Sequence, residues 1–174
     1  MKKAVSFILT LVAVFGLLAT PFNVAAATAD SKAGKVSLTS GTLNIRKSAS
    51  KNSAVLSSLK NGAYITLISK SGNWWKVEYK NSAYGYCHDN YIKTVSGTPK
   101  KVKLTSGTLN VRKGAGTSYS VVDSLANGKT VIQLSSSNGW SRILYSGTKL
   151  GYVSSKYITS TSTSTKYKDI NLNV

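Results

Sequence analysis

The most informative feature of this chain is a stretch that occurs twice. It reads VSLTSGTLNIRK at residues 36–47 and VKLTSGTLNVRK at residues 102–113, an offset of 66 residues. Without a gap, the same offset pairs Trp74 with Trp140 and Gly62 with Gly128. Chance similarity does not keep its register for so long. The chain is therefore a tandem duplication of a unit of about 60 residues, which is near the lower size limit for independent folding.

Within each copy, apolar and polar residues alternate with a period of two. Leu43 and Ile45 fall on one face of an extended segment, and Asn44 and Arg46 fall on the other. The apolar runs are short, rich in Val, Ile, Thr and Tyr, and separated by turn signals such as the Asn-Gly pairs at 61–62 and 127–128. After the N-terminal segment, no stretch has helical periodicity. This pattern predicts an all-β fold in which about five or six short strands per copy close into a small barrel.

Three motifs, in the same order in both copies, resemble those of bacterial Src-homology-3 (SH3) domains. The segments LNIR (43–46) and LNVR (109–112) resemble the opening motif of that family. WWKV (74–77) and WSRI (140–143) resemble its Trp-x-basic-Val strand, and GYCHDNYI (85–92) and GYVSSKYI (151–158) resemble its closing segment. The resemblance implies half-open barrels of antiparallel strands. It also implies modules that dock exported proteins onto peptidoglycan or its peptide bridges, usually beside a wall-cleaving domain.

The expected organisation is two tandem SH3-like β-barrels at residues 36–95 and 102–160. We expect linkers at 30–35 and 96–101, and a Thr/Ser-rich linker with a C-terminal tail at 161–174. Residues 1–29 have the order of parts of a secretory signal peptide, with two lysines, an apolar run and small residues near a cleavage site. The apolar run is shorter than the roughly 20 residues that a membrane span needs. We therefore expect secretion, with no stable membrane insertion after cleavage.

Charge points to an anionic partner. Lys and Arg number 23 against 5 Asp and Glu, which gives a formal net charge of +18. Such a chain attracts polyanions and releases them as the salt concentration rises. For a secreted protein the expected partners are peptidoglycan or an anionic wall polymer, or a peptide ligand. Nucleic acid is not expected, because it lies in another compartment.

The candidate binding residues are aromatic and polar side chains that recur in both copies. Aromatic side chains offer flat contact area at low entropic cost, and a few polar groups fix the register of an extended ligand. The resemblance implies that a Trp at a strand start and a Tyr of the closing turn line a peptide groove. The residues that match this pattern, with their polar neighbours, are Trp74, Tyr91, Asn44 and Arg46 in the first copy and Trp140, Tyr157, Asn110 and Arg112 in the second. Packing in the core is the alternative for each tryptophan, and it is favoured for Tyr86 and Tyr152.

A catalytic reading finds little support in the sequence. Cys87 and His88 are neighbours on an expected strand, so their side chains point to opposite faces and do not form a nucleophile–base pair. The counterpart of Cys87 is Val153, which indicates a small apolar core position. Because the chain has one His and one Cys, a two-His zinc site is excluded and no internal disulfide forms. We expect no catalytic residues, metal or cofactor.

The sequence thus favours a non-catalytic cell-wall binding or targeting module that is secreted and wall-associated. One alternative is the targeting portion or remnant of a multidomain wall hydrolase. In this view the final DINLNV (169–174) resembles the first strand leading into a papain-like peptidase domain. Another alternative is a secreted adhesion or signalling ligand that binds peptides through a groove or an edge strand.

Overall fold

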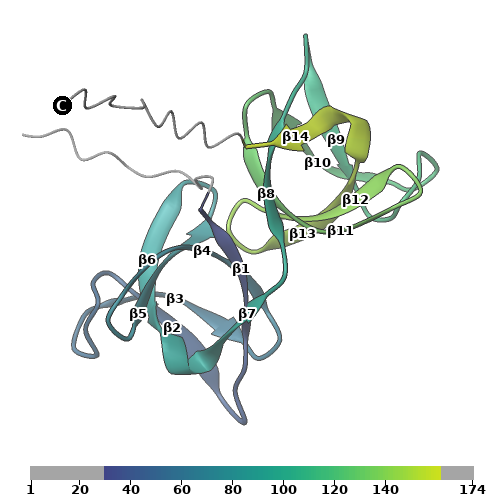
Figure 1. Ribbon diagram of the computed structural model, residues 1–174. Coiled ribbons are helices and arrows are strands. Elements are labelled where there is room, and N and C mark those ends of the chain that lie inside the picture. The colour runs from purple at the N-terminus through teal and green to yellow at the C-terminus, as the bar shows by residue number, and fades with distance from the viewer. Residues whose placement is uncertain (1–29, 162–174) are drawn as a thin grey trace, which may run out of the picture.

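The computed structural model describes residues 30–161. The expected signal peptide (1–29) and nearly all of the expected C-terminal linker and tail (162–174) lie outside the described residues. Between residues 30 and 161 no helix is both long and apolar enough to cross a membrane. The described chain forms two β-barrels, one from each copy of the repeat (Figure 1).

Each barrel has seven strands and one short 3₁₀ turn. The first comprises β1 (Lys32–Val36), β2 (Thr42–Arg46), β3 (Val55–Lys60), β4 (Tyr64–Ser71), β5 (Trp74–Lys80), β6 (Ala83–His88), η1 (Asp89–Tyr91) and β7 (Ile92–Val95). The second comprises β8 (Thr98–Val102), β9 (Thr108–Arg112), β10 (Val121–Ala126), β11 (Thr130–Ser137), β12 (Trp140–Tyr145), β13 (Lys149–Ser154), η2 (Ser155–Tyr157) and β14 (Ile158–Ser160).

The two barrels share one topology. The strand order is β3-β2-β6-β5-β4-β1-β7 in the first and β10-β9-β13-β12-β11-β8-β14 in the second, and all pairs are antiparallel. The register shifts in β4 between Leu67 and Ser69, and in β11 between Gln133 and Ser135. Because a bulge bends a strand and increases its twist, these equivalent irregularities let one continuous sheet curl into a small barrel. The prediction of two tandem all-β barrels is confirmed.

The expected linkers at 30–35 and 96–101 are largely strand, which corrects that interpretation. β1 lies between β4 and β7, and β8 occupies the same place in the second barrel. Gly34 is buried in β1, and an added Cβ there would lie 2.9 Å from Leu67. These segments look like linkers because they are rich in Lys and Gly and contain Pro99. They form strands because their backbones pair on both sides. Only Ser96 and Gly97 separate β7 from β8.

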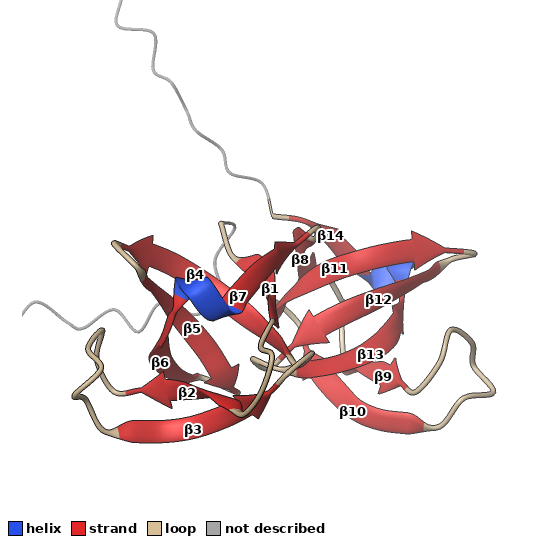
Figure 2. Ribbon diagram, turned by 90° about the horizontal axis from the view of Figure 1, so that it is seen from below, coloured by secondary structure: helices blue, strands red, loops and turns tan. Residues whose placement is uncertain are grey.

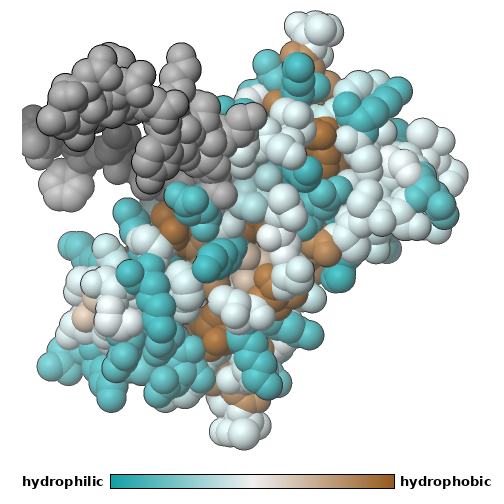
Figure 3. Space-filling view, in the orientation of Figure 1, coloured by the Kyte–Doolittle hydropathy of each residue, from teal (hydrophilic) through white to brown (hydrophobic). Residues whose placement is uncertain are grey.

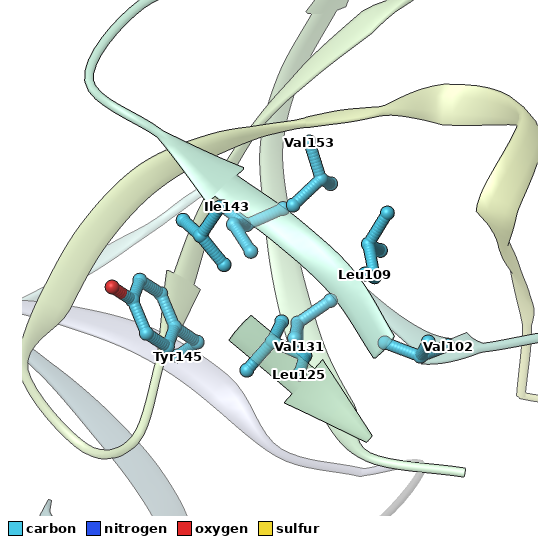
Figure 4. Close-up of a cluster of buried hydrophobic side chains, with 8 residues drawn as sticks. Val102, Leu109, Leu125, Val131, Ile143, Tyr145 and Val153 are labelled. Carbon is cyan, nitrogen blue, oxygen red and sulfur yellow. The ribbon is translucent and has the colours of Figure 1, made fainter. Parts of the chain in front are cut away.

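Each barrel closes around its own hydrophobic core. In the first barrel the fully buried residues are Val36, Leu43, Ile45, Ile65, Leu67, Val77 and Cys87. In the second they are Val102, Leu109, Val111, Leu125, Val131, Ile143, Tyr145 and Val153 (Figure 4). Most of these positions correspond through the 66-residue offset, so the duplication preserved the core.

Two packed positions differ in chemistry between the copies. Leu67 and Trp75 pack in the first barrel, and their counterparts are Gln133 and Ser141. Gln133 Nε2 donates a hydrogen bond to the buried Ser141 Oγ at 2.6 Å, and that hydroxyl also lies 2.7 Å from Ser155 Oγ. An apolar pair has thus been replaced by a hydrogen-bonded polar pair, which satisfies buried polar groups that would otherwise be costly. This exchange explains why Trp75 has no aromatic counterpart.

The two barrels pack against each other through an interdomain interface (Figure 2). Its hydrophobic centre joins Ala33 of the first barrel to Ile132 and Leu144 of the second, all at most 1% exposed. Tyr64, Val95 and Leu134 pack around this cluster. Burying two large aliphatic side chains contributes about 1.5–3 kcal/mol each. Elsewhere, the face seen in Figure 3 is mostly hydrophilic, with hydrophobic residues in separate patches.

Hydrogen bonds fix the orientation of this interface. The turn after β12 brings the carbonyl of Gly147 to β4, where it accepts bonds from the Thr66 backbone N–H at 2.8 Å and from the Thr66 hydroxyl at 3.1 Å. Lys129 Nζ donates to Asn81 Oδ1 at 2.8 Å, also across the interface. Thr66 and Glu78 are only 2% and 3% exposed, although the strand pattern places them on the outer face of the barrel. The second barrel therefore covers the part of the first barrel's outer face that surrounds Thr66 and Glu78.

Candidate functional site

A groove lies along the opening strand of the first barrel. It has a volume of about 460 Å³ and runs between β2, the loop that follows it, and η1. The residues that line it are Leu38, Ser40, Gly41, Thr42, Leu43, Asn44, Arg46, Lys51, Trp74, His88 and Tyr91. We call this hollow groove 1. Its aromatic residues include Trp74 and Tyr91. β2 adds the polar side chains of Asn44 and Arg46, because alternation along that strand sends them outward while Leu43 and Ile45 fill the core.

The second barrel has the corresponding hollow, groove 2, with a volume of about 610 Å³. It is lined by Lys103, Leu104, Thr105, Ser106, Thr108, Leu109, Asn110, Arg112, Thr117, Trp140, Ser154, Lys156 and Tyr157. All residues of groove 1 except Gly41 have their 66-residue counterpart in this set. The two copies therefore share a surface groove as well as a hydrophobic core.

All eight candidate residues lie at these two grooves, four at each. The tryptophans Trp74 and Trp140 are half-buried and belong to neither barrel core, whereas Tyr91 and Tyr157 are 47% and 36% exposed. Tyr86 and Tyr152 do not line either groove. The structure thus brings the candidates together, and their role in binding stays a prediction.

The two arginines also hold a loop in place. Arg46 Nη1 donates to the Ser53 carbonyl at 2.7 Å, and Arg112 Nη1 donates to the Tyr119 carbonyl at 2.7 Å. Each bond spans the loop that borders its groove, so the guanidinium fixes that wall from within. A guanidinium has five N–H donors. One loop contact therefore leaves this group with further donor capacity toward a ligand.

Sequence reasoning missed His88 as a groove residue. It lies directly opposite Trp74 in the β5–β6 register, with ring centroids 5.3 Å apart in an edge-to-face arrangement, and 5.9 Å from the Tyr91 ring. The available signal was alternation, because a residue next to the buried Cys87 must face outward. A comparison of the two copies does not identify His88, because its counterpart is Ser154. Lys51, Lys103 and Lys156 were missed for the same reason.

Both grooves are electropositive. Neither set of lining residues contains a carboxylate, while Arg46 and Lys51 line groove 1 and Lys103, Arg112 and Lys156 line groove 2. Most acids of the described residues are paired with a lysine or buried. Asp123 pairs with Lys149 at 2.8 Å, Asp89 pairs with Lys70 at 2.6 Å, and Glu78 is buried and accepts a hydrogen bond from the Ser82 N–H. An aromatic groove with a cationic rim favours an extended ligand that carries negative charge.

Cys87 is a core residue, as expected from its counterpart Val153. Both side chains are 0% exposed. Burial raises the pKa of the Cys87 thiol to about 12, so the reactive thiolate is disfavoured at neutral pH. His88 lies on the other side of the strand, among the aromatic residues of groove 1. The two side chains therefore belong to separate environments.

Comparison with curated proteins finds relatives that are named as an endopeptidase and as an amidase. The chain is 42% identical over 76 residues to a probable endopeptidase p60 of Listeria innocua, which covers 42% of this chain and 16% of that protein. It is 25% identical over 134 residues to a putative N-acetylmuramoyl-L-alanine amidase YrvJ of Bacillus subtilis, which covers 73% of this chain and 26% of that protein. The chain thus spans about a quarter or less of the length of these relatives.

Comparison with solved structures finds NlpC2 from Trichomonas vaginalis, with a TM-score of 0.38 and 13% identity over 75% of this chain and 48% of that one. The family model described as a bacterial SH3 domain matches residues 41–93 and again residues 107–159. These two segments make up more than half of the chain, and each lies within one of the two barrels. The chain therefore belongs to the bacterial SH3 domain family and carries two such domains in tandem.

Proposed function

We propose that this chain is a non-catalytic, wall-associated binding module whose two grooves hold peptide segments of the bacterial cell wall. The observation that carries the proposal is the retention of exposed polar residues in both copies. Asn44 and Asn110 are exposed on strands, where Asn is a poor β-former, so sheet stability does not explain their presence. A shared ligand explains it, because an amide beside two aromatic walls fixes the register of an extended peptide.

The relatives support the wall as the site of action. One is named as a probable endopeptidase and the other as a putative N-acetylmuramoyl-L-alanine amidase, whose name specifies a bond of the wall polymer. The matched segments form a small part of each. This chain then acts outside the cell, where its positive charge draws it to an anionic wall and its grooves select the peptide.

Two grooves on one chain increase the strength of attachment. A second weak site that engages the same polymer binds at a raised effective concentration, so the pair exceeds either groove alone. The interdomain interface keeps both grooves in one geometry, which reduces the ordering cost of the second contact.

Co-sedimentation with purified peptidoglycan sacculi tests this function. The full chain should sediment, and Trp74→Ala combined with Trp140→Ala should lower the bound fraction by roughly tenfold or more, since buried aromatic anchors contribute about 2 kcal/mol or more each. The matched control is Val55→Ala with Val121→Ala, which removes apolar side chains that are 50% and 47% exposed at equivalent places outside the grooves. Circular dichroism verifies the fold. Normal sedimentation of the tryptophan variant would refute the assignment of the grooves.

A second proposal concerns the partner of the module. Because the relatives carry hydrolase names, we infer that this chain positions a separate catalytic unit at the wall. The chain alone should release no soluble fragments from sacculi and should increase their release when fused to a wall hydrolase. Release by the unfused chain would contradict a purely binding role.

A further inference from the structure

The two grooves differ at the residue that faces the tryptophan. In groove 1 this residue is His88, the one histidine of the chain, which lies between Trp74 and Tyr91. In groove 2 the same place holds Ser154. Histidine is the side chain that ordinarily changes its charge between pH 5 and 8. Groove 1 therefore contains a titratable group where groove 2 has a hydroxyl.

The surroundings of His88 Nδ1 fit two protonation states. This nitrogen lies 3.3 Å from the backbone N of Asn90, which donates to it when it is unprotonated. It also lies 3.3 Å from Asp89 Oδ1, a buried oxygen that has no hydrogen-bond partner among the described residues. When Nδ1 carries a proton, it no longer accepts from Asn90, and it donates to this carboxylate and satisfies the oxygen. Both states thus have a partner already in place.

Asp89 is kept ionised, as an acceptor for His88 Nδ1, by a neighbouring lysine. Lys70 Nζ lies 2.6 Å from its other carboxylate oxygen, Oδ2. The hydrogen bond from Lys70 lowers the pKa of Asp89, so the carboxylate keeps its negative charge in mildly acidic solution. The counterpart of Asp89 in the second barrel is Ser155, which hydrogen-bonds to Ser141. The second barrel therefore has neither the histidine nor the carboxylate behind it.

The charged groups around His88 act in opposite directions. The rings of Trp74 and Tyr91 flank His88 in edge-on and tilted arrangements, and Asp89 of η1 favours the imidazolium. Lys70 of β4, and the Arg46 and Lys51 side chains that line the same groove, oppose it. A negative group entering the groove offsets these three cations and adds to the attraction. Protonation of His88 and binding of an anion therefore favour each other.

We propose that groove 1 contains an anion subsite, formed by His88, Arg46 and Lys51, that takes a carboxylate of an extended wall peptide and tightens when His88 is protonated. Groove 2 takes its ligand with Arg112, Lys103 and Lys156, and no histidine lines it. This inference rests on the proposed function and deepens it. It makes the first barrel the pH-responsive half of the pair.

The test is a proton NMR titration of the full chain between pH 5 and 8. Because the chain has one histidine, its Cε1–H resonance reports the state of His88 without assignment work. The probes are the tetrapeptide Ala-Glu-Lys-Ala with free carboxylates and its neutralised form, Ala-Gln-Lys-Ala amide. The free acid should move the titration midpoint of the resonance to higher pH, and the amide should leave it unchanged. Equal effects of both peptides, or none, would overturn the subsite.

Affinity measurements give the second readout. In a Trp140→Ala background, which weakens groove 2, the free acid should bind about threefold or more tightly at pH 5.5 than at pH 7.5, as expected for one added charge contact. His88→Gln should abolish this ratio, and the matched control Ser154→Gln should leave it intact. Circular dichroism checks that each variant is folded. A pH ratio that survives His88→Gln would assign the effect to another group and refute the proposal.

The outcome is separable from that of the wall-binding function. Sacculi that bind the protein through Trp74 and Trp140, together with a flat pH ratio, would leave the function standing and remove the subsite. A peptide-induced shift of the His88 resonance in a protein that does not sediment with sacculi would retain the subsite and remove the wall role.

Discussion

Substituting Gly147 with alanine tests how tightly the two barrels are coupled. Gly147 has a φ of +87°, and an added Cβ would lie 2.6 Å from backbone atoms of Tyr79 and Lys80 in the other barrel. The change therefore has a local part and an interdomain part. Gly139 separates them, because its φ of +77° is similar and an added Cβ would have no heavy atom within 4 Å.

The magnitudes differ enough to measure. Left-handed backbone disfavours alanine by roughly 1–2 kcal/mol, which is the whole effect expected for Gly139→Ala. In Gly147→Ala the turn must also move away from β5, and the two hydrogen bonds from Thr66 to the Gly147 carbonyl contribute about 0.5–1.5 kcal/mol each. The clash adds to that loss. We expect Gly147→Ala to lower the free energy of unfolding by about 3 kcal/mol or more, about twice the effect of the control.

Differential scanning calorimetry and hydrogen exchange measure these effects. For a protein of this size a loss of 1 kcal/mol lowers Tm by roughly 2–4 °C. Exchange of the Thr66 amide, which donates to Gly147, should accelerate in Gly147→Ala and stay slow in Gly139→Ala. If both variants show the same Tm and the same Thr66 exchange, the interface does not couple the barrels in solution and the reasoning fails.

Three further outcomes follow from the core and from charge. Cys87 should resist thiol reagents in the native protein at pH 8 and react on unfolding, because burial raises the pKa of its thiol to about 12. Cys87→Val should leave the free energy of unfolding within about 1.5 kcal/mol of wild type. Rapid labelling of the native protein would contradict this burial. Ser141→Ala should lower the free energy of unfolding by about 1–3 kcal/mol, because it leaves Gln133 without its hydrogen-bond partner. Adding Gln133→Leu should recover part of this loss. Two additive losses would disprove the pairing. Burial, followed by the charge of Asp123, raises the pKa of Tyr145 from 10.0 to about 12. The folded state favours the neutral phenol, so Tyr145 contributes fully to the free energy of unfolding below pH 10, and this contribution is lost as the pH rises toward 12. In chemical denaturation, the free energy of unfolding of Tyr145→Phe should therefore decline less steeply over that interval than that of the wild type.

The sequence was sufficient for the features that depend on local pattern. Alternation identified strands and core positions such as Ile45 and Val111, and the repeat placed eight residues that the structure brings together in two grooves. Strand pairing was harder to foresee. β1 and β8 carry little apolar alternation, and their identity as strands depends on neighbours that are distant in sequence.

Features created by contact between the copies were not predictable from either copy alone. Thr66 and Glu78 alternate as outward residues of a barrel, and they are buried only because the second barrel covers them. His88 was not predicted as a groove residue, because a comparison of the two copies selects residues that are identical in both. The residues that make the two grooves different therefore lie at positions that this comparison does not select.

The interdomain interface also determines which surfaces each repeat can still offer. Thr66 and Glu78 of the first barrel and their counterparts Ile132 and Leu144 of the second are all buried, so the same positions of the repeat are covered in both barrels. Neither barrel can therefore present these positions to a further partner while the tandem stays packed.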